Sequence, residues 1–481
     1  MSAELDALSA REAARIVANK EISPVELVRR ALDKAEESQA TINAFCVLRR
    51  DAALVEAKRA EDAVQRGEPL GPLHGVPFSV KDLISVAGLP YASGSRAMAD
   101  NVGTVDAPSV ERARAAGAIL IGKTTTSEFG CKPVGDSPLT GITRNPLDLS
   151  LTPGGSSAGC AASVAAGVTP FALGTDGGGS IRIPAALTGT FGFKANFGRV
   201  PVWPASATPT LAHVCPLARN VADAALLLQA IAGYDPCDPA SIAGPVPDFL
   251  AACEAPPRGL RVAWSPTLGY ATAEPEVVDI CARAARRLEQ AGCVVEEVER
   301  VFAADPEDLW TAEFYAGVGT RLRPILETRR DLLDPAVATI LEAALQQDMR
   351  AYYETVFRRY ALRDDLLAFF SRYDVLLSPT LPIVALEAGR DIPPGLEHRN
   401  LVSWVYYTYP FNLTGQPAAS LPVGLAKPGL PVGMQIIAGR NDETTVLKVA
   451  AWLEREIGVE RGGPAHQPGA ATGRRRSRRR S

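Results

Sequence analysis

Apolar residues recur at helical spacing along much of the chain and form short unbroken runs elsewhere. Positions 25, 27, 28, 32 and 35 share one helical face, and Ser23 followed by Glu26 has the spacing of a capping box. Similar patterns predict helices at 51–66, 108–116, 223–232, 275–291 and 444–456, a small-residue helix within 160–172 and long helices across 307–371. Apolar runs predict strands at 78–86, 118–121, 293–298, 373–378 and 432–437, and one that begins at 171.

This mixture of helices and buried strands is typical of the α/β class. No convincing linker interrupts the chain before Gly462, so we expect a single domain over residues 1–461. Residues 462–481 carry six arginines among their last nine positions. Such a run of like charges cannot contribute to a core, so the sequence predicts a disordered, Arg-rich tail at 462–481.

Composition and charge exclude several classes of function. The chain has 481 residues, is 47% hydrophobic and carries a net charge of -4, which gives its body no basic footprint for nucleic acid. No apolar stretch is long and uncharged enough to span a membrane, and no secretory signal is evident. The eight scattered cysteines form no C-x-x-C pair. We therefore expect a cytoplasmic protein with no metal, cofactor, nucleic-acid or membrane partner.

Two loops dense in glycine and serine, at 152–159 and 174–182, suggest where the chemistry lies. Gly177, Gly178 and Gly179 precede Ser180 directly, and successive glycines let backbone N–H groups converge on one oxyanion. Ser180 is thus a candidate nucleophile whose carbonyl target would sit in that nest. A plain loop serine is the alternative for Ser180 taken alone.

A serine needs a base, and the four histidines show no neighbouring carboxylate pattern that marks one of them as that base. Lys81 is the better candidate, because it stands in the apolar run 77–84. Burial disfavours the ammonium form and lowers the pKa of a lysine, which makes the neutral amine available as a base.

Three motifs together give the chain a resemblance to the amidase signature family. They are Gly-Val-Pro-x-x-x-Lys-Asp at 75–82, Gly-Gly-Ser-Ser-x-Gly at 154–159 and Gly-Thr-Asp-x-Gly-Gly-Ser-Ile-Arg at 174–182. The likeness continues through 410–417 and 430–436, and it extends from about residue 5 to residue 457. It implies one α/β domain with a large, mixed, twisted sheet covered by helices on both faces.

The resemblance also implies a catalytic triad and its supports. Ser180 matches the acylated serine, Ser156 the relay serine that follows a cis peptide bond, and Lys81 the base. Asp176 and Arg182 flank the nucleophile and are expected to hold its loop by charge-assisted hydrogen bonds. One departure is Ala158, which stands where glycine is usual.

The family analogy further nominates residues for the substrate pocket, namely Cys131, Trp203, Trp404 and Tyr407. Aromatic residues lie more often in a core than in a pocket, so these assignments are weaker than the triad. The resemblance implies a small-molecule amide as substrate, and it leaves a homodimer open.

Two other motifs offer rival interpretations of the site. Residues 117–124 match the P-loop pattern, but a helix precedes them and their interior is an apolar strand, which argues against nucleotide binding. Residues 155–159 match the Gly-x-Ser-x-Gly elbow of α/β-hydrolases, but no strand leads into them.

Three functions remain open at this point. A free-standing amidase is favoured. The A subunit of a tRNA-dependent amidotransferase would instead hydrolyse glutamine, and it meets the ammonium group with an acidic residue where this chain has Val405. A catalytically inactive binding homologue is the third, although both serines and the lysine are present.

Overall fold

A mixed sheet of eleven strands runs through the molecule in the order β1-β3-β2-β6-β8-β7-β12-β13-β11-β9-β10. The computed structural model describes residues 2–427 and 429–458, so the tail predicted at 462–481 lies outside the described residues. The strands are β1 Phe45–Leu48, β2 Pro77–Lys81, β3 Ile119–Thr124, β6 Phe171–Asp176, β7 Phe191–Lys194, β8 His213–Ala218, β9 Arg261–Trp264, β10 Val294–Glu297, β11 Val375–Pro379, β12 Ala418–Ala426 and β13 Leu430–Ala438. A separate short pair is formed by β4 Asp136–Ser137 and β5 Gly141–Ile142.

Parallel pairing is confined to two parts of this sheet. Strand β2 is parallel to both β3 and β6, and β9 is parallel to both β10 and β11. The remaining pairs are antiparallel, including the hairpin of β12 and β13. The mixed sheet expected from the family resemblance is therefore confirmed.

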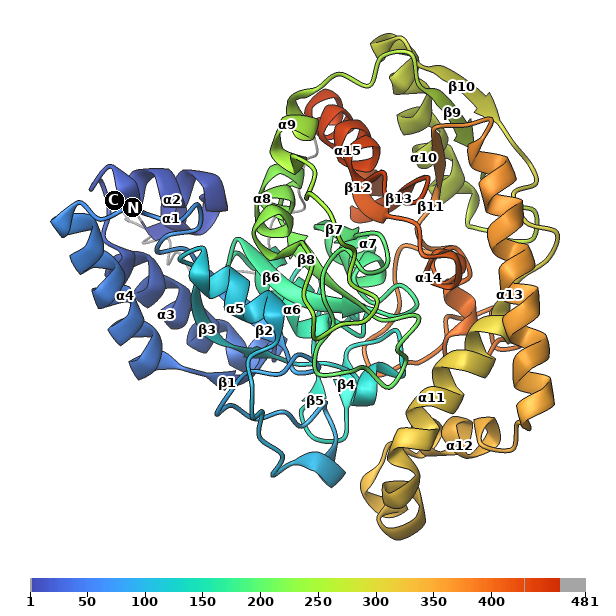
Figure 1. The fold of residues 1–481 in the computed structure, drawn as a ribbon, viewed down its shortest axis with the longest axis horizontal. Coiled ribbons are helices and arrows are strands. Elements are labelled where there is room, and N and C mark those ends of the chain that lie inside the picture. The colour runs from blue at the N-terminus through green and yellow to red at the C-terminus, as the bar shows by residue number, and fades with distance from the viewer. Residues whose placement is uncertain (1, 428, 459–481) are drawn as a thin grey trace, which may run out of the picture.

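Helices cover both faces of the sheet (Figure 1). They are α1 Ser2–Ala7, α2 Ala10–Ala18, α3 Pro24–Ile42, α4 Arg50–Arg66, α5 Pro108–Ala115, α6 Ala158–Ala165, α7 Arg182–Thr188, α8 Val221–Ile231, α9 Phe249–Glu254, α10 Pro275–Arg287, α11 Glu307–Thr328, α12 Pro335–Ala344, α13 Met349–Phe370, α14 Pro410–Thr414 and α15 Glu443–Ile457. Strand β8 shows the two faces clearly, because Val214 and Ala218 belong to the largest core cluster, whereas Cys215 and Leu217 pack with α6 and α7.

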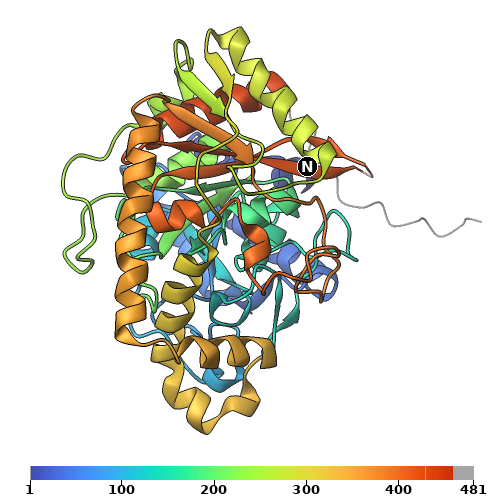
Figure 2. The same ribbon diagram turned by 90° about the vertical axis from the view of Figure 1, so that its right-hand side faces the viewer.

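Three helices stand beside the sheet, and one of them, α11, forms a wall of the pocket described below. Helices α11 and α13 pack side by side, and α12 crosses at their end (Figures 1 and 2). No helix among the described residues combines the length and the apolar character that crossing a bilayer requires.

Most predicted elements are confirmed, and the differences have local causes. Helix α3 begins with the predicted capping box at Ser23 and Glu26. The strand predicted at 78–86 ends at Lys81, where the N–H of Ile84 donates to the Lys81 carbonyl and turns the chain. Strand β12 was not predicted from the sequence; it follows the loop at 415–417 and completes the hairpin with β13.

The P-loop interpretation of 117–124 is not supported by this fold. Residues Ile119–Thr124 form β3 in the sheet interior, so no Gly-rich loop is available to surround a phosphate. Lys123 is buried, and its ammonium lies 2.8 Å from the Asp82 carboxylate and donates to the Pro90 carbonyl at 2.7 Å.

Candidate active site

Two neighbouring parallel strands carry the candidate base and the candidate nucleophile to the same edge of the sheet. Strands β2 and β6 pair in parallel, with Ser79 opposite Ala172, so their carboxyl ends lie together. Lys81 is the last residue of β2, and Ser180 lies in the loop that follows β6. The loop that contains Ser156 joins them, because the N–H of Ser157 donates to the Ser180 carbonyl at 3.2 Å.

The structure brings Lys81, Ser156 and Ser180 into one hydrogen-bonded chain. The Lys81 Nζ donates to Ser156 Oγ at 2.8 Å, and Ser156 Oγ donates to Ser180 Oγ at 3.0 Å. A second acceptor of the lysine is Thr175 Oγ1, also at 2.8 Å. The peptide bond between Gly155 and Ser156 is cis, as the family resemblance implies. Lys81 and Ser156 are buried, whereas Ser180 is partly exposed.

The surroundings of Lys81 favour its neutral form. Burial is the main cause, and it lowers the pKa of the Lys81 amine to about 7. The Asp176 carboxylate opposes this shift but forms no ion pair with the lysine among the described residues. Since both hydrogen-bond partners of the Nζ atom are hydroxyl groups, a proton taken up by the amine has a path through Ser156.

A buried ion pair holds the loop of the nucleophile. Arg182 Nη2 and Nε each donate to one oxygen of Asp176 at 2.9 Å, and both side chains are fully buried. Burial alone would raise the pKa of Asp176, but the Arg182 guanidinium holds that pKa well below its usual range. Arg182 also donates to Gln435 Oε1 at 2.6 Å and to Asn412 Oδ1 at 2.6 Å. The structure thus brings Asp176 and Arg182, the two predicted supporting residues, into direct contact beside Ser180.

The glycine loop differs in one respect from the prediction. The N–H of Gly179 donates to Asp176 Oδ1 at 2.8 Å, so this donor is already used within the loop. The carbonyl of Gly177 accepts from Trp310 Nε1 at 2.8 Å. Because N–H and C=O point to opposite sides of a trans peptide unit, the N–H of Gly178 is directed away from Trp310. Of the three glycines predicted to bind the oxyanion, Gly179 is the one whose N–H group already donates to another acceptor, the Asp176 carboxylate.

Close packing explains why glycine is needed in this loop. A Cβ atom on Gly178 would lie 2.7 Å from the Trp310 ring, and one on Gly179 would lie 2.3 Å from Thr408 Oγ1. Gly179 also has a φ of 134°, which L side chains rarely adopt. The Thr408 hydroxyl donates to the Gly178 carbonyl at 2.6 Å and fixes the loop from outside.

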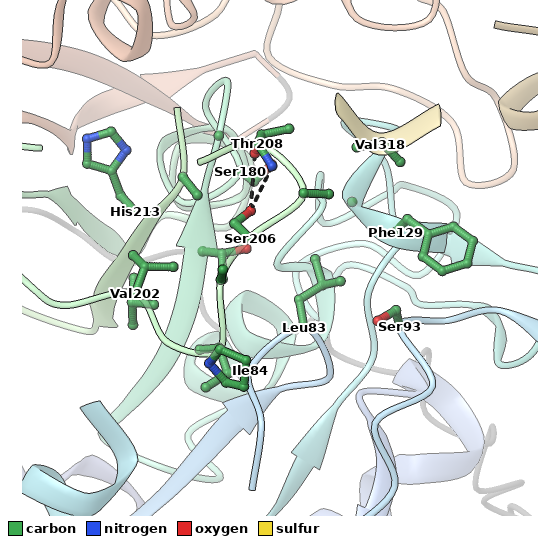
Figure 3. Close-up of a pocket in the computed structure, with 18 of the residues that line it drawn as sticks. Leu83, Ile84, Ser93, Phe129, Ser180, Val202, Ser206, Thr208, His213 and Val318 are labelled. Atoms are coloured by element: carbon green, nitrogen blue, oxygen red, sulfur yellow. Dashed lines mark hydrogen bonds between the residues drawn. The ribbon is translucent and has the colours of Figure 1, made fainter. Parts of the chain in front are cut away.

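A cavity of about 170 Å³ opens beside Ser180. Its walls combine apolar and polar residues and come mainly from the segment after β2, the segment after β7 and helix α11 (Figure 3). Labelled apolar residues around it are Leu83, Ile84, Phe129, Val202 and Val318. The Ser180 hydroxyl therefore opens to a cavity of modest size whose walls offer both apolar surface and polar groups.

Comparison with known proteins agrees with this arrangement. A family model described as Amidase matches residues 26–447. An acylamidase from Rhodococcus erythropolis is 37% identical over 93% of this chain and 95% of that protein. The A subunit of a glutamyl-tRNA(Gln) amidotransferase from Moorella thermoacetica is 36% identical over 96% of this chain and 99% of its own length. The crystal structure of a bacterial aryl acylamidase of the amidase signature family superimposes with a TM-score of 0.88 at 32% identity and covers 93% of this chain and 96% of that one.

This chain belongs to the amidase signature family. It is an enzyme that hydrolyses amides, and a free-standing amidase is favoured over the amidotransferase component.

Of the pocket residues nominated for this amidase, the structure places only Trp203 at the cavity. Trp404 and Tyr407 are buried in the core, and neither lines the cavity beside Ser180. The polar group of each is satisfied there, because Trp404 Nε1 donates to the Asp391 carbonyl and Tyr407 Oη to the Pro266 carbonyl. These two assignments are therefore corrected.

Cys131 is also a core residue in this amidase and does not line the cavity. Its side chain is fully buried, and its carbonyl accepts from Tyr315 Oη at 3.2 Å. Burial raises the pKa of the Cys131 thiol, which keeps the sulfur protonated and unreactive.

The Gly-x-Ser-x-Gly interpretation finds no support in the geometry either. Ser157, the central serine of that pattern, is buried and donates to the Thr175 carbonyl at 3.1 Å. His213 does line the cavity, but its ring nitrogens contact Leu211 and Asp176 carbonyls and the Lys194 amine.

Several residues that shape this amidase site were missed by sequence reasoning. Thr175 accepts from the base, Thr408 fixes the glycine loop, and Asn412 and Gln435 complete the environment of Arg182. A signal for two of them was present, because Asn412 and Gln435 lie inside the motifs at 410–417 and 430–436. Nothing in the sequence says that these motifs meet Arg182, which lies more than two hundred positions away.

Proposed function

We propose that this chain is a free-standing amidase that cleaves small amides through an acyl-enzyme on Ser180. The observation that carries the proposal is the chain of hydrogen bonds from Lys81 through Ser156 to Ser180, with lengths of 2.8 and 3.0 Å. The buried amine at its inner end has a lowered pKa, and the hydroxyl at its outer end opens to a cavity.

Acylation begins when Ser180 Oγ attacks the amide carbonyl carbon. As the new C–O bond forms, the Ser180 proton passes to Ser156, whose own proton passes to neutral Lys81. Ser156 and Lys81 thereby act together as the base, and of the three side chains only the amine changes its net charge. A buried amine suits this role because its neutral form needs no water to stay stable.

The developing oxyanion needs donors, and the glycine loop offers them. We assign this role to the N–H groups of Gly177, Gly178 and Ser180, while the N–H of Gly179 stays with Asp176. The Asp176 carbonyl accepts from Asn412 and His213, which turns the N–H of Gly177 to the opposite side of that peptide unit. Each oxyanion donor contributes about 3 kcal/mol to lowering the barrier.

The second half of the reaction returns the proton. Protonated Lys81 gives its proton back through Ser156 to the leaving amine as the C–N bond breaks. Water then attacks the acyl-enzyme with the same relay as its base, and the carboxylate product departs. In the net reaction, one amide and one water molecule give one carboxylic acid and one amine.

The lining of the cavity indicates the class of amide. Leu83, Ile84, Val202 and Val318 present apolar surface next to Ser180. The similarity to an acylamidase and to an aryl acylamidase supports acyl amides of apolar or aromatic amines as substrates. Val405 is a buried core residue and stands where the amidotransferase component has an acid, so this chain supplies no carboxylate from that position for the ammonium group of glutamine.

The test compares release of aniline from a series of acyl anilides by wild type, Ser180→Ala and Ser157→Ala. We expect Ser180→Ala to lose at least about 10⁴-fold in kcat and Ser157→Ala to keep most activity, because Ser157 lies outside the proton path. Mass spectrometry of wild type during turnover of a slow substrate is expected to find the acyl group on the peptide of Ser180. Loss of activity in Ser157→Ala alone would instead favour the Gly-x-Ser-x-Gly mechanism.

A further inference from the structure

Helix α11 presents one charged residue on its cavity face. Phe314, Val318, Arg321 and Leu322 all line the cavity beside Ser180, and their spacing of four, three and one places them on one side of the helix. Three of the four are apolar, as expected for a wall that meets an apolar substrate. Arg321 interrupts this pattern, and the proposed mechanism does not use it.

The Arg321 guanidinium has little to neutralise it. Its Nη1 donates to the Ala205 carbonyl at 2.7 Å, and the side chain is exposed. Within residues 2–427 and 429–458, no carboxylate forms an ion pair with it. Its positive charge acts on Tyr91, another cavity residue, where it opposes the rise that burial causes in the pKa of the phenol.

The carboxylates that line the two cavities are already engaged. Asp176 lines the cavity but pairs with Arg182. Glu313 and Asp348 line a second, wider cavity that shares Arg321 with the first. Glu313 pairs with Arg359, and Asp348 accepts from the N–H of Ala351 at 2.8 Å as a helix cap. A ligand anion is therefore the natural partner of Arg321.

Helix α11 determines how far Arg321 lies from the nucleophile loop. Phe314 packs against the nucleophile loop, since a Cβ atom on Gly177 would lie 3.0 Å from its ring. Arg321 follows seven positions later, which corresponds to about 10 Å along the helix axis. Arg321 borders both cavities, together with Ser206 and Ala207, so it lies where the two cavities adjoin.

We propose that Arg321 is a specificity residue that binds a carboxylate carried by the substrate roughly 10 Å from its scissile carbonyl. The substrate class is then an amide with an apolar middle, which fills the space along Val318 and Leu322, and an anionic end beside Arg321. A guanidinium suits this task because its planar donors match a carboxylate. This inference rests on the proposed amidase activity and narrows its substrates.

The test uses acyl anilides whose long acyl chain ends in a carboxylate, in a methyl group or in a trimethylammonium group. We expect wild type to prefer the carboxylate over the methyl end by about tenfold in kcat/KM, and the trimethylammonium end to be the poorest. A shorter acyl chain, whose carboxylate cannot reach Arg321, is expected to lose this preference. Added salt should weaken the preference, because the pair is exposed to solvent.

Variants of Arg321 separate charge recognition from a structural effect. We expect Arg321→Gln to remove the preference for the carboxylate mainly through KM, and Arg321→Lys to restore part of it. The matched control is Arg323→Gln on the same helix, because Arg323 is exposed, pairs with Glu327 and lines neither cavity; it should keep the wild-type preference.

Two results would overturn the inference. One is equal kcat/KM for the carboxylate and methyl ends in wild type, and the other is an equal loss for both ends in Arg321→Gln. If wild type cleaves none of the anilides, the proposed function fails, and calorimetry with Ser180→Ala still decides the inference: the carboxylate amide must bind more tightly than the methyl amide, and Arg321→Gln must abolish the difference.

Discussion

Two lysines of this amidase are buried to the same degree and yet have different surroundings. Lys81 ends β2 and its Nζ donates to the hydroxyls of Ser156 and Thr175. Lys194 ends β7, and its Nζ donates to the Ala195 carbonyl at 3.3 Å and, through a short contact, to the Gln416 carbonyl. Burial lowers the pKa of both amines to about 7.

The difference lies in what the partners can do with a proton. A hydroxyl both accepts and donates, so a proton can pass through Ser156 to or from Lys81. A carbonyl only accepts, so the contacts of Lys194 hold two segments together and end there. Lys194 also lies 3.4 Å from His213 Nε2, but the other ring nitrogen of this histidine contacts the Leu211 and Asp176 carbonyls. In the proposed mechanism, a lowered pKa therefore becomes catalytic only when a relay connects the amine to a nucleophile.

The largest expected effect comes from exchanging each lysine for methionine. Lys81→Met should lower kcat by about 10³- to 10⁴-fold, because the relay loses its base. Lys194→Met should keep kcat within about threefold and lose about 1–3 kcal/mol of stability, because the buried Gln416 carbonyl loses its donor. Steady-state kinetics and chemical denaturation of both variants measure these effects. A similar loss of activity in both variants would contradict the distinction between them.

A second comparison concerns ion pairs at the site and on the surface. Asp176→Asn should destabilise the protein by about 3–5 kcal/mol, because it leaves the fully buried Arg182 without its counter-charge. Glu327→Gln, which breaks an exposed pair with Arg323, should cost less than about 1 kcal/mol. Urea denaturation gives both values. A cost below about 1 kcal/mol for Asp176→Asn would mean that this pair does not hold the nucleophile loop.

These comparisons also show what the sequence could and could not predict. Ser180 became a candidate because glycines precede it, and Lys81 because it stands in an apolar run, whereas Ser156 was nominated through the family resemblance. Most helices and several strands followed from periodicity, since α3 and α10 carry their apolar residues on one face.

The errors concern contacts between distant segments and the direction of single groups. Trp404 and Tyr407 were placed in the pocket by family analogy, but an aromatic side chain suits a core as well as a pocket, and only the fold shows the carbonyls that satisfy them. The N–H of Gly179 turns toward Asp176 through a local backbone angle that three consecutive glycines leave undetermined. Asn412 and Gln435 reach Arg182 only in the folded chain.

The smallest expected effect concerns Thr175, the second hydroxyl partner of Lys81. Thr175→Val removes one acceptor from the amine and should lower kcat/KM by about three- to tenfold. A lone pair from Thr175 favours the charged ammonium, so its loss should move the pKa of Lys81 further down. The pH at which activity rises is then expected to fall in Thr175→Val and to return in Thr175→Ser. An unchanged pH profile in Thr175→Val would show that Thr175 does not act on the base.

The pH dependence of kcat/KM tests the role of Lys81 most directly. The amine must be neutral to accept a proton, so activity should be low below its pKa, rise through a limb near pH 7 and then level off. The rise in kcat/KM reflects loss of a proton from Lys81 in the free enzyme. The residual activity of Lys81→Met should therefore lack this limb. A wild-type profile without a limb near neutrality, or the same limb in Lys81→Met, would contradict the assignment of Lys81 as the base.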